Sequence, residues 1–171
     1  MTRDCISFMV YVIMGVSGCG KTTIGKLLAK QLNLPFYDAD NFHPQSNIKK
    51  MEQRIPLNDE DRKPWLEILS EQISEWNQTG GAVLACSALK KSYRDLIGKS
   101  HVNGAGKVKF IYLKGSKEMI YDRLKEREGH YMPPELLNSQ FEDLEEPKHA
   151  ITVNIDQKPE TIVQNILKLL T

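Results

Sequence analysis

The chain has 171 residues, 40% of them hydrophobic and 26% charged, which is enough to bury the core of a single globular domain spanning residues 1–171. Its formal net charge of +1 gives no basic surplus for a nucleic-acid or membrane partner. The three cysteines (Cys5, Cys19 and Cys86) include no CxxC pair and predict reduced thiols rather than a disulfide framework or zinc site.

The first half of the chain alternates between predicted strands and helices. An apolar strand at 8–14 is too short to span a membrane and has no signal-peptide cleavage site, so we expect an intracellular, cytoplasmic protein. A helix follows at 21–32, then a strand at 36–37 and short helices within 41–60. The next helix has Leu66, Leu69, Ile73 and Trp76 at helical spacing and Pro64 in its first turn, with Trp65 and Trp76 in the core.

The second half continues the alternation, with strands at 82–86, 107–113 and 151–155. Helices are expected at 88–97, 117–126, from about 135, and at 161–170. Residues 128–134 (EGHYMPP) break regular structure because of a glycine and two prolines. The alternation predicts an α/β fold in which helices cover both faces of a parallel sheet.

Residues 15–22 (GVSGCGKT) form a complete GxxxxGK[ST] motif, or P-loop, between a predicted strand and an amphipathic helix. Its glycines allow amide N–H groups to turn toward a phosphate, and the helix N-terminus adds positive potential. The motif predicts a P-loop NTPase in which Lys21 meets the β- and γ-phosphates and Thr22 reaches Mg²⁺. The expected ATP-binding residues here are Gly15, Val16, Ser17, Gly18, Cys19, Gly20, Lys21, Thr22 and Thr23.

Cys19 lies inside this motif and allows two interpretations. Neighbouring amides could lower its thiol pKa, in which case alkylation should block ATP binding. Alternatively, it is only a small residue at a position that tolerates one.

The other motifs resemble the gluconokinase family. The most specific are DADNFHP at 38–44, PLNDEDRKPWL at 56–66, ACSALK at 85–90 and GHYMPP at 129–134, and with the P-loop and further matching stretches up to NIDQKPETIVQNIL at 154–167 they cover nearly the whole chain. The family is similar in fold to shikimate kinases and nucleoside monophosphate kinases. The resemblance implies transfer of the ATP γ-phosphoryl group to the C6 hydroxyl of D-gluconate, with Mg²⁺. It also implies an acceptor-binding region at about 40–64, a mobile lid at about 127–135, and a homodimer.

Asp38 and Asp40 follow the second strand, at the sheet edge where such folds bind ligands. The resemblance implies that Asp38 supports Mg²⁺ through water and that Asp40 holds or deprotonates the acceptor hydroxyl. A helix-capping or solvated acidic pair is the alternative. His43 either hydrogen-bonds a polyol hydroxyl or is structural.

A planar arginine is the natural partner of the gluconate carboxylate. Arg62 is the first candidate and Arg54 the second, although either could instead pair with Asp59 or Asp61.

Ser87 and Lys90 follow a buried strand at the same edge. The resemblance favours Ser87 as an acceptor contact, whereas Lys90 either reaches an anionic group of the acceptor or has no role in binding it. Lys91 and Arg94 are expected to face water. Gln140 is a further gluconate contact implied by the resemblance alone.

Arg123 and Arg127 are four residues apart on one helix face. The resemblance implies that Arg123 packs on adenine and that Arg127 stabilises the transferring phosphoryl group, and the alternative is a surface charge row. By resemblance, Asp156 and Gln157 border adenine. Gly129 and the prolines at 133–134 would limit the lid.

Two rival functions can be compared with these residues. A kinase of the same fold with another acceptor, such as shikimate or a nucleoside monophosphate, keeps the P-loop chemistry. Shikimate kinases usually have three glycines where this chain has Cys86, Ser87 and Ala88. A nucleotide-binding regulator without catalysis would be expected to lack Lys21, Asp40 or Arg127, and all three are present.

Overall fold

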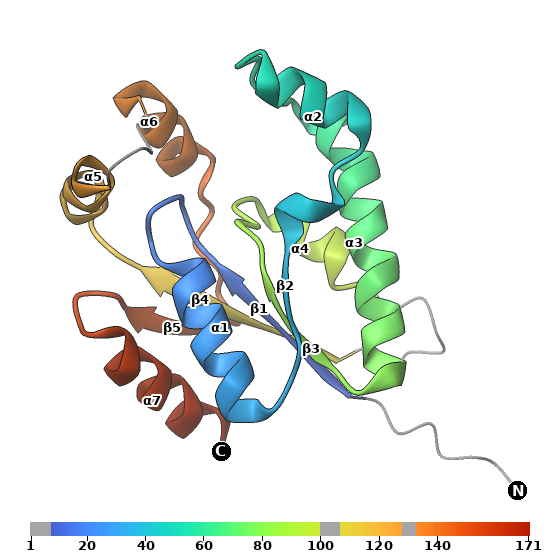
Figure 1. Ribbon diagram of the computed structural model, residues 1–171, viewed down its shortest axis with the longest axis vertical. Helices are drawn as coiled ribbons and strands as arrows, with labels where there is room; N and C mark the ends of the chain where they lie inside the picture. Colours follow the sequence, from blue (N-terminus) through green and yellow to red (C-terminus); the bar gives the residue numbers. More distant parts are fainter. Residues whose placement is uncertain (1–7, 100–106, 128–132) are drawn as a thin grey trace, which may run out of the picture.

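Five parallel strands form one sheet within residues 8–99, 107–127 and 133–171, which the computed structural model describes. Their order across the sheet is β2-β3-β1-β4-β5 (Figure 1). The predicted parallel α/β architecture is therefore confirmed. The strands are β1 (Met9–Met14), β2 (Phe36–Asp38), β3 (Ala82–Ala85), β4 (Lys107–Lys114) and β5 (Ile151–Asn154).

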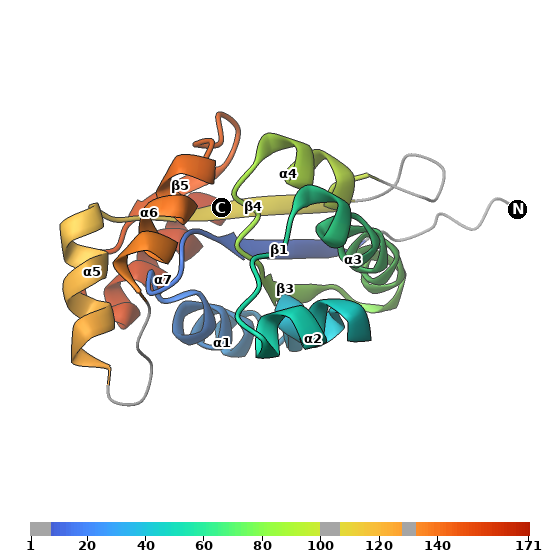
Figure 2. The same ribbon diagram turned by 90° about the horizontal axis from the view of Figure 1, so that it is seen from above.

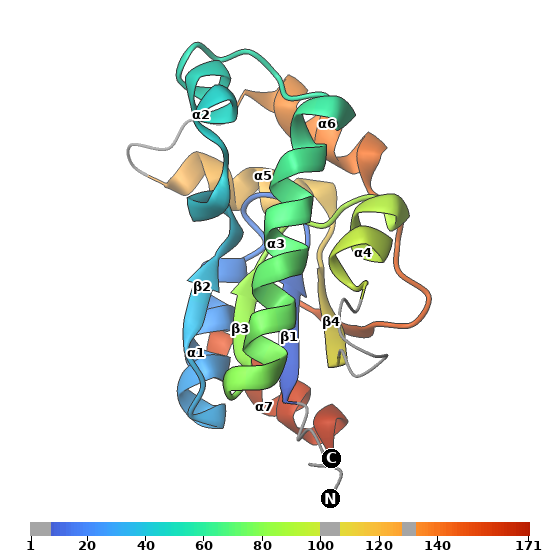
Figure 3. The same ribbon diagram turned by 90° about the vertical axis from the view of Figure 1, so that its right-hand side faces the viewer.

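Helices cover both faces of the sheet. α1 and α7 pack on one face, and α3 and α4 pack on the other, as the views from above and from the side show (Figure 2 and Figure 3). Near the carboxyl ends of the strands, α5 and α6 lie to one side and α2 to the other (Figure 1). The helices are α1 (Lys21–Leu32), the 3₁₀ helix η1 (Ala39–Phe42), α2 (Gln45–Glu52), α3 (Asp59–Thr79), α4 (Lys91–Ile97), α5 (Lys117–Glu126), α6 (Pro134–Asp143) and α7 (Pro159–Leu170).

Successive side chains of β1 point to opposite faces of the sheet, so the strand contributes to two separate core layers. Ile13 packs with Leu28 of α1 and Ile166 of α7. Val12 belongs to the other layer, with Leu69 of α3. All five side chains are fully buried. Burial on both faces explains why the sequence of this strand is continuously apolar.

The start of α3 differs from the prediction. Asn58 caps the helix: its side chain accepts a hydrogen bond from the Asp61 N–H at 2.8 Å, and the Asp61 carboxylate accepts one from the Asn58 N–H at 3.0 Å. This capping box starts the helix at Asp59, so Pro64 lies in the second turn rather than the first. The predicted boundary was wrong because this capping pair was not recognised.

The beginning of α4 and the placement of Arg94 also correct the prediction. The helix starts at Lys91 rather than at residue 88, because Ala88 has a φ of 45°, which is incompatible with a right-handed helix. Arg94 was expected to face water but is only 7% exposed. Backbone carbonyls within the fold accept hydrogen bonds from its guanidinium, which allows the cation to be buried.

The expected lid falls mostly on residues 128–132, which lie outside the described residues. At its two ends, Arg127 follows the last turn of α5 and Pro134 is the first residue of α6. No helix in the described parts of the chain is long and apolar enough to cross a membrane.

Candidate active site

The P-loop connects β1 to α1 at the carboxyl edge of the sheet (Figure 1). Gly15, Gly18 and Gly20 have φ values of 147°, 84° and 98°, which residues with a Cβ rarely adopt. Lys21 Nζ donates to the carbonyl oxygens of Gly15 and Val16, both at 3.1 Å. The lysine therefore lies over the loop, within reach of a phosphate placed there.

Cys19 is only 1% exposed, and the lower-pKa interpretation is wrong. Burial raises the pKa of its thiol, and this effect outweighs the lowering by Lys21 and nearby amides. A Cβ added to Gly15 would lie 2.7 Å from Cys19 Sγ, so the thiol packs tightly inside the loop. Cys19 is therefore a small packing residue, and its thiol is protonated near neutral pH.

A cavity of about 490 Å³ lies above the P-loop and extends to the residues that follow β2 and β3. It brings together residues that are far apart in the sequence and that sequence reasoning had proposed for ATP, metal and acceptor binding. The lining residues are Ser17, Gly18, Gly20, Lys21, Thr22, Thr23, Asp38, Asp40, Ala85, Cys86, Ser87 and Arg127.

Asp38 and Asp40 both line this pocket, and Asp38 is also a cap. Its Oδ1 accepts a hydrogen bond from the Asp40 N–H at 3.0 Å at the start of η1. Asp38 therefore caps η1 and lines the pocket at the same time, so the two interpretations of this residue do not exclude each other. The Asp40 side chain is open to solvent (83% exposed), but partial desolvation by the protein atoms around it raises its pKa, and the negative charge of Asp38 raises it further. Asp40 is consequently a stronger base than an ordinary aspartate, and it lies in the pocket.

His43 is held from two sides next to Asp40. Its ring stacks on Trp65 at 4.3 Å between centroids, and Asn47 Nδ2 lies 3.2 Å from His43 Nδ1. An amide nitrogen can only donate, so Nδ1 is the acceptor and the ring proton is on Nε2. His43 Nε2 lies 3.9 Å from Asp40 Oδ1. Burial lowers the pKa of His43, which keeps the imidazole neutral and its N–H available as a donor near the pocket.

Arg62 and Lys90 meet on one carboxylate, that of Asp59, at 3.8 and 3.1 Å. Tyr93 completes this basic cluster: its hydroxyl donates to Asp59 and accepts from Arg62 Nη1 at 3.2 Å. The ring of Tyr93 lies 5.7 Å from the Arg62 guanidinium and 5.6 Å from Lys90 Nζ. Arg54, the second candidate, is exposed after α2 and is not part of this cluster.

The proposed adenine-side residues are also brought together. Arg123 Nη2 donates to the carbonyl oxygen of Ile155 at 2.7 Å, immediately before Asp156. Asp156 and Gln157 bond to Asn154 at the end of β5, which fixes the turn. Arg127, one helical turn after Arg123, lines the pocket instead. The two arginines therefore have different surroundings, and their roles toward adenine and the phosphoryl group stay predictions.

Gln140 contacts the P-loop. Its Oε1 accepts from the Ser17 backbone N–H at 2.7 Å, and its Nε2 donates to Ser17 Oγ at 3.0 Å. The side chain thus lies on the phosphate-binding side of the pocket. Its role as a gluconate contact stays a prediction.

Sequence reasoning missed three residues that support the site. Asn47 is 2% exposed and also donates to the Asp61 carbonyl at 2.9 Å, which ties His43 to α3. Trp65 was read only as a core residue, but its indole N–H donates to the Ala39 carbonyl at 2.8 Å. Tyr93 links the two basic side chains. The signal for Trp65 was its indole N–H, which needs a partner when buried.

Comparisons with known proteins agree with this geometry. The family model described as shikimate kinase matches residues 17–171. The thermoresistant gluconokinase of Escherichia coli K12 is 42% identical over 94% of this chain and 93% of its own length. A gluconokinase of Arabidopsis thaliana is 44% identical over 98% of this chain and 95% of its own length.

Solved structures give the same result. The crystal structure of a gluconokinase from Sinorhizobium meliloti 1021 has a TM-score of 0.83 at 38% identity, covering 97% of this chain and 92% of that chain. The shikimate kinase of Aquifex aeolicus, at 19% identity and a TM-score of 0.59 over 95% of this chain and 96% of that chain, shares the fold. The chain therefore belongs to the gluconokinase family of P-loop kinases, which is related in fold to the shikimate kinases.

Proposed function

We propose that the protein is a gluconokinase that transfers the ATP γ-phosphoryl group to the C6 hydroxyl of D-gluconate. The observation that carries this proposal is the shared pocket, which is lined by Lys21, Thr22, Asp38, Asp40 and Arg127. A phosphate donor and a hydroxyl acceptor can both reach such a pocket. Relatives named gluconokinase at 42–44% identity support gluconate as the acceptor.

Mg²⁺ is the proposed metal. The Thr22 hydroxyl and the Asp38 carboxylate line the same pocket, and the described residues contain no cluster of three or more His, Cys, Asp or Glu that could hold a metal. This sparse donor set fits Mg²⁺, which takes most of its ligands from nucleotide phosphates and water. When bound, the ion supplies positive charge to the phosphate oxygens.

The residues of this chain would divide the remaining chemistry. Lys21 exchanges its carbonyl partners for phosphate oxygens, and Arg127 adds positive charge where the phosphoryl group moves. Asp40, with its raised pKa, accepts the hydrogen bond of the C6 hydroxyl and takes its proton as the bond to phosphorus forms. His43 Nε2–H is a donor for a second hydroxyl of the acceptor.

Beyond the residues that line the cavity, Arg62 and Lys90 would bind the gluconate carboxylate, with Ser87 of the cavity lining beside it, and Arg123, Asp156 and Gln157 would border adenine. Arg62 and Lys90 already converge on the carboxylate of Asp59, which supports the proposal that they can also bind the carboxylate of gluconate. The link between Arg123 and Ile155 supports an adenine site near residue 156.

We also propose a cellular compartment for the protein. The free thiols of Cys19 and Cys86 are both buried, which suits a reducing compartment such as the cytoplasm. A homodimer stays a prediction.

The test is coupled ADP release with Mg·ATP and a panel of acceptors: D-gluconate, its epimers, shikimate and nucleoside monophosphates. We expect turnover on gluconate with the 6-phosphate as product, identified by ³¹P NMR. Turnover on another acceptor alone would disprove the acceptor and retain the kinase. Absence of ADP release with every member of the panel would count against the proposal as a whole.

A further inference from the structure

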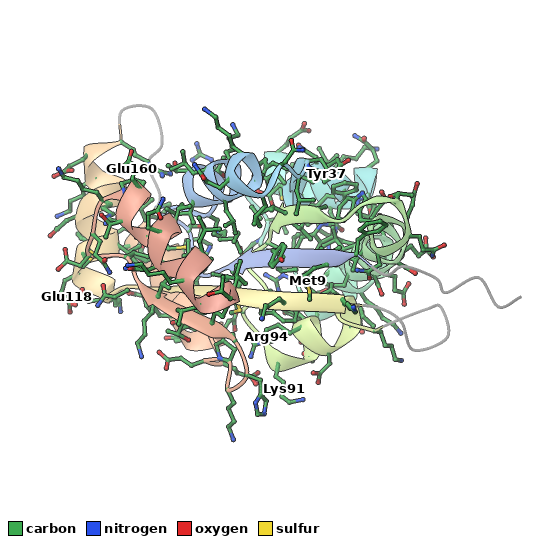
Figure 4. The ribbon with its side chains drawn as sticks, turned by 90° about the horizontal axis from the view of Figure 1, so that it is seen from below. Met9, Tyr37, Lys91, Arg94, Glu118 and Glu160 are labelled. Atoms are coloured by element: carbon green, nitrogen blue, oxygen red, sulfur yellow. The ribbon has the colours of Figure 1, made fainter. Side chains whose placement is uncertain are left out.

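Arg94 is a buried cation with no assigned role. It lies in α4, on the side toward the sheet, whereas Lys91 of the same helix points away (Figure 4). Within the described residues its hydrogen bonds go to backbone carbonyls: Nη1 to Ala88 at 2.7 Å and Leu89 at 2.9 Å, and Nη2 to Glu145 at 2.7 Å. No carboxylate within the described residues forms an ion pair with it. Burying a charge is unfavourable, so its retention calls for an explanation.

The segment that Arg94 holds is a wall of the pocket. Cys86 and Ser87 line the cavity, and the Ser87 carbonyl accepts a hydrogen bond from the Gly15 N–H of the P-loop at 3.2 Å. The next residue, Ala88, has a φ of 45°, a conformation that is unfavourable for a residue with a Cβ. Strained backbone of this kind persists only where its surroundings enforce it, and the Arg94 bonds to residues 88 and 89 do so.

The other end of Arg94 reaches a different part of the chain. The carbonyl oxygen of Glu145 accepts the hydrogen bond from Arg94 Nη2, and the backbone N–H of Glu145 donates to the Leu89 carbonyl at 2.9 Å. Residues 144–146 follow α6 directly, and Leu144 N–H bonds to the Gln140 carbonyl at 3.0 Å. Arg94 therefore fastens the wall formed by residues 86–89 to the segment that follows α6.

We propose that Arg94 is a positioning residue for the acceptor: it holds Ser87 and its neighbours at the place where the acceptor must lie against the P-loop. The inference rests on the proposed function for the identity of the acceptor. Arg94 does not line the cavity, so it acts through the backbone of residues 87–89. A displacement of about 1 Å in a substrate-positioning group can cost roughly 100-fold in rate.

The experiment compares Arg94→Lys and Arg94→Met with Asn77→Ala as a matched control. Asn77 is also buried, and its side chain donates to the carbonyls of Phe8 at 2.6 Å and Lys107 at 2.9 Å. These contacts lie at the amino end of the sheet, away from the pocket. Each purified variant is measured for Tm and for kcat and KM with gluconate and with ATP.

We expect Arg94→Lys to raise KM for gluconate by about tenfold or more while KM for ATP stays within about twofold, because lysine cannot make the divergent guanidinium contacts. Arg94→Met should have the larger effect. Asn77→Ala should lower Tm and leave both KM values unchanged. If Arg94→Met does not fold, the lysine variant carries the test.

Two results would overturn the inference. One is a loss of Tm in Arg94→Lys with an unchanged KM for gluconate, which would make Arg94 purely structural. The other is an equal rise in both KM values, which would indicate general loosening. If the wild-type protein does not phosphorylate gluconate, the proposed function fails, and Arg94 is then judged with the panel acceptor that the wild type does use.

Discussion

Gln140 holds Ser17 through both ends of its side-chain amide, with Oε1 2.7 Å from the Ser17 backbone nitrogen and Nε2 3.0 Å from Ser17 Oγ. The two residues are 123 positions apart in the sequence. The contact joins α6 to the P-loop, so a change in Gln140 should be felt where phosphates bind.

Gln140→Glu should raise KM for ATP by roughly tenfold, because a carboxylate there adds negative charge beside the phosphate-binding loop. Glutamate can still accept from the Ser17 N–H and hydroxyl, so it mainly adds charge, whereas Gln140→Met removes both hydrogen bonds without adding charge and should have a smaller effect. Initial-rate kinetics with each substrate varied in turn separate the two variants. Equal effects would show that charge at this position is irrelevant, and a rise confined to KM for gluconate would support the acceptor contact implied by the resemblance.

Asp40→Asn should lower kcat by about 10²–10⁴-fold, the range typical for loss of a general base, with KM for ATP nearly unchanged. The side chain keeps its size but no longer takes a proton. Asp61→Asn is a suitable control, because Asp61 pairs with Lys50 at 2.7 Å and does not line the pocket. An Asp40→Asn enzyme with wild-type kcat would remove Asp40 from the chemistry.

The activity should also depend on pH in a way that follows from the acidic pair. Burial, and then the charge of Asp38, raise the pKa of Asp40 above its ordinary value of 3.8. Because the ionised carboxylate is the active form, kcat/KM for gluconate should fall as pH decreases, with a midpoint above 3.8.

Asp38→Asn removes the repulsion and should move this midpoint to lower pH, even though it also reduces the plateau rate. The comparison uses pH profiles normalised to each plateau. His43 also titrates next to Asp40, but its pKa is lowered, so its protonation affects the profile only below pH 6.5. A midpoint that does not move, or that moves upward, would show that Asp38 does not control the ionisation of Asp40.

Cys19 should resist alkylation in the folded protein. Its thiol is 1% exposed and its pKa is raised by burial, so little thiolate is available to react. Cys86 is buried too, and burial raises its pKa to about 12. Peptide mass spectrometry after iodoacetamide treatment should find both unmodified, and both modified when urea is added first. Rapid modification of Cys19 in the native enzyme would contradict this expectation.

The fold was predictable because its signals are local. The helix at 21–32 and the helix at 117–126 were predicted with the bounds that the structure gives, since apolar spacing and flanking glycine or serine residues define them. The start of α3 was also readable, from Asn58 and Asp61 three residues apart. What failed there was recognition of the motif.

The lining of the cavity was predictable where a motif specifies backbone and side chain together, as in the P-loop and at Asp38 and Asp40. Arg94 was not, because a charged residue on a short helix usually faces water and only tertiary contacts reveal the carbonyls that bind it. The position of Gln140 on Ser17 likewise depends on how α6 packs. The pKa of Cys19 required knowing its burial, which outweighs the nearby amides.

The two core layers on either side of the sheet have a consequence for how such enzymes diversify. Ala39, Cys86 and Ala88, which are next to the proposed acceptor residues Asp40 and Ser87, belong to the layer built by α3 and α4, whereas Val16 and Cys19 of the P-loop belong to the layer of α1 and α7. Because the sheet separates the two layers, we expect mutations in one layer to affect the packing of the other mainly through the strands they share. A lineage could therefore exchange its acceptor by altering one side of the molecule while inheriting the phosphate donor machinery unchanged on the other.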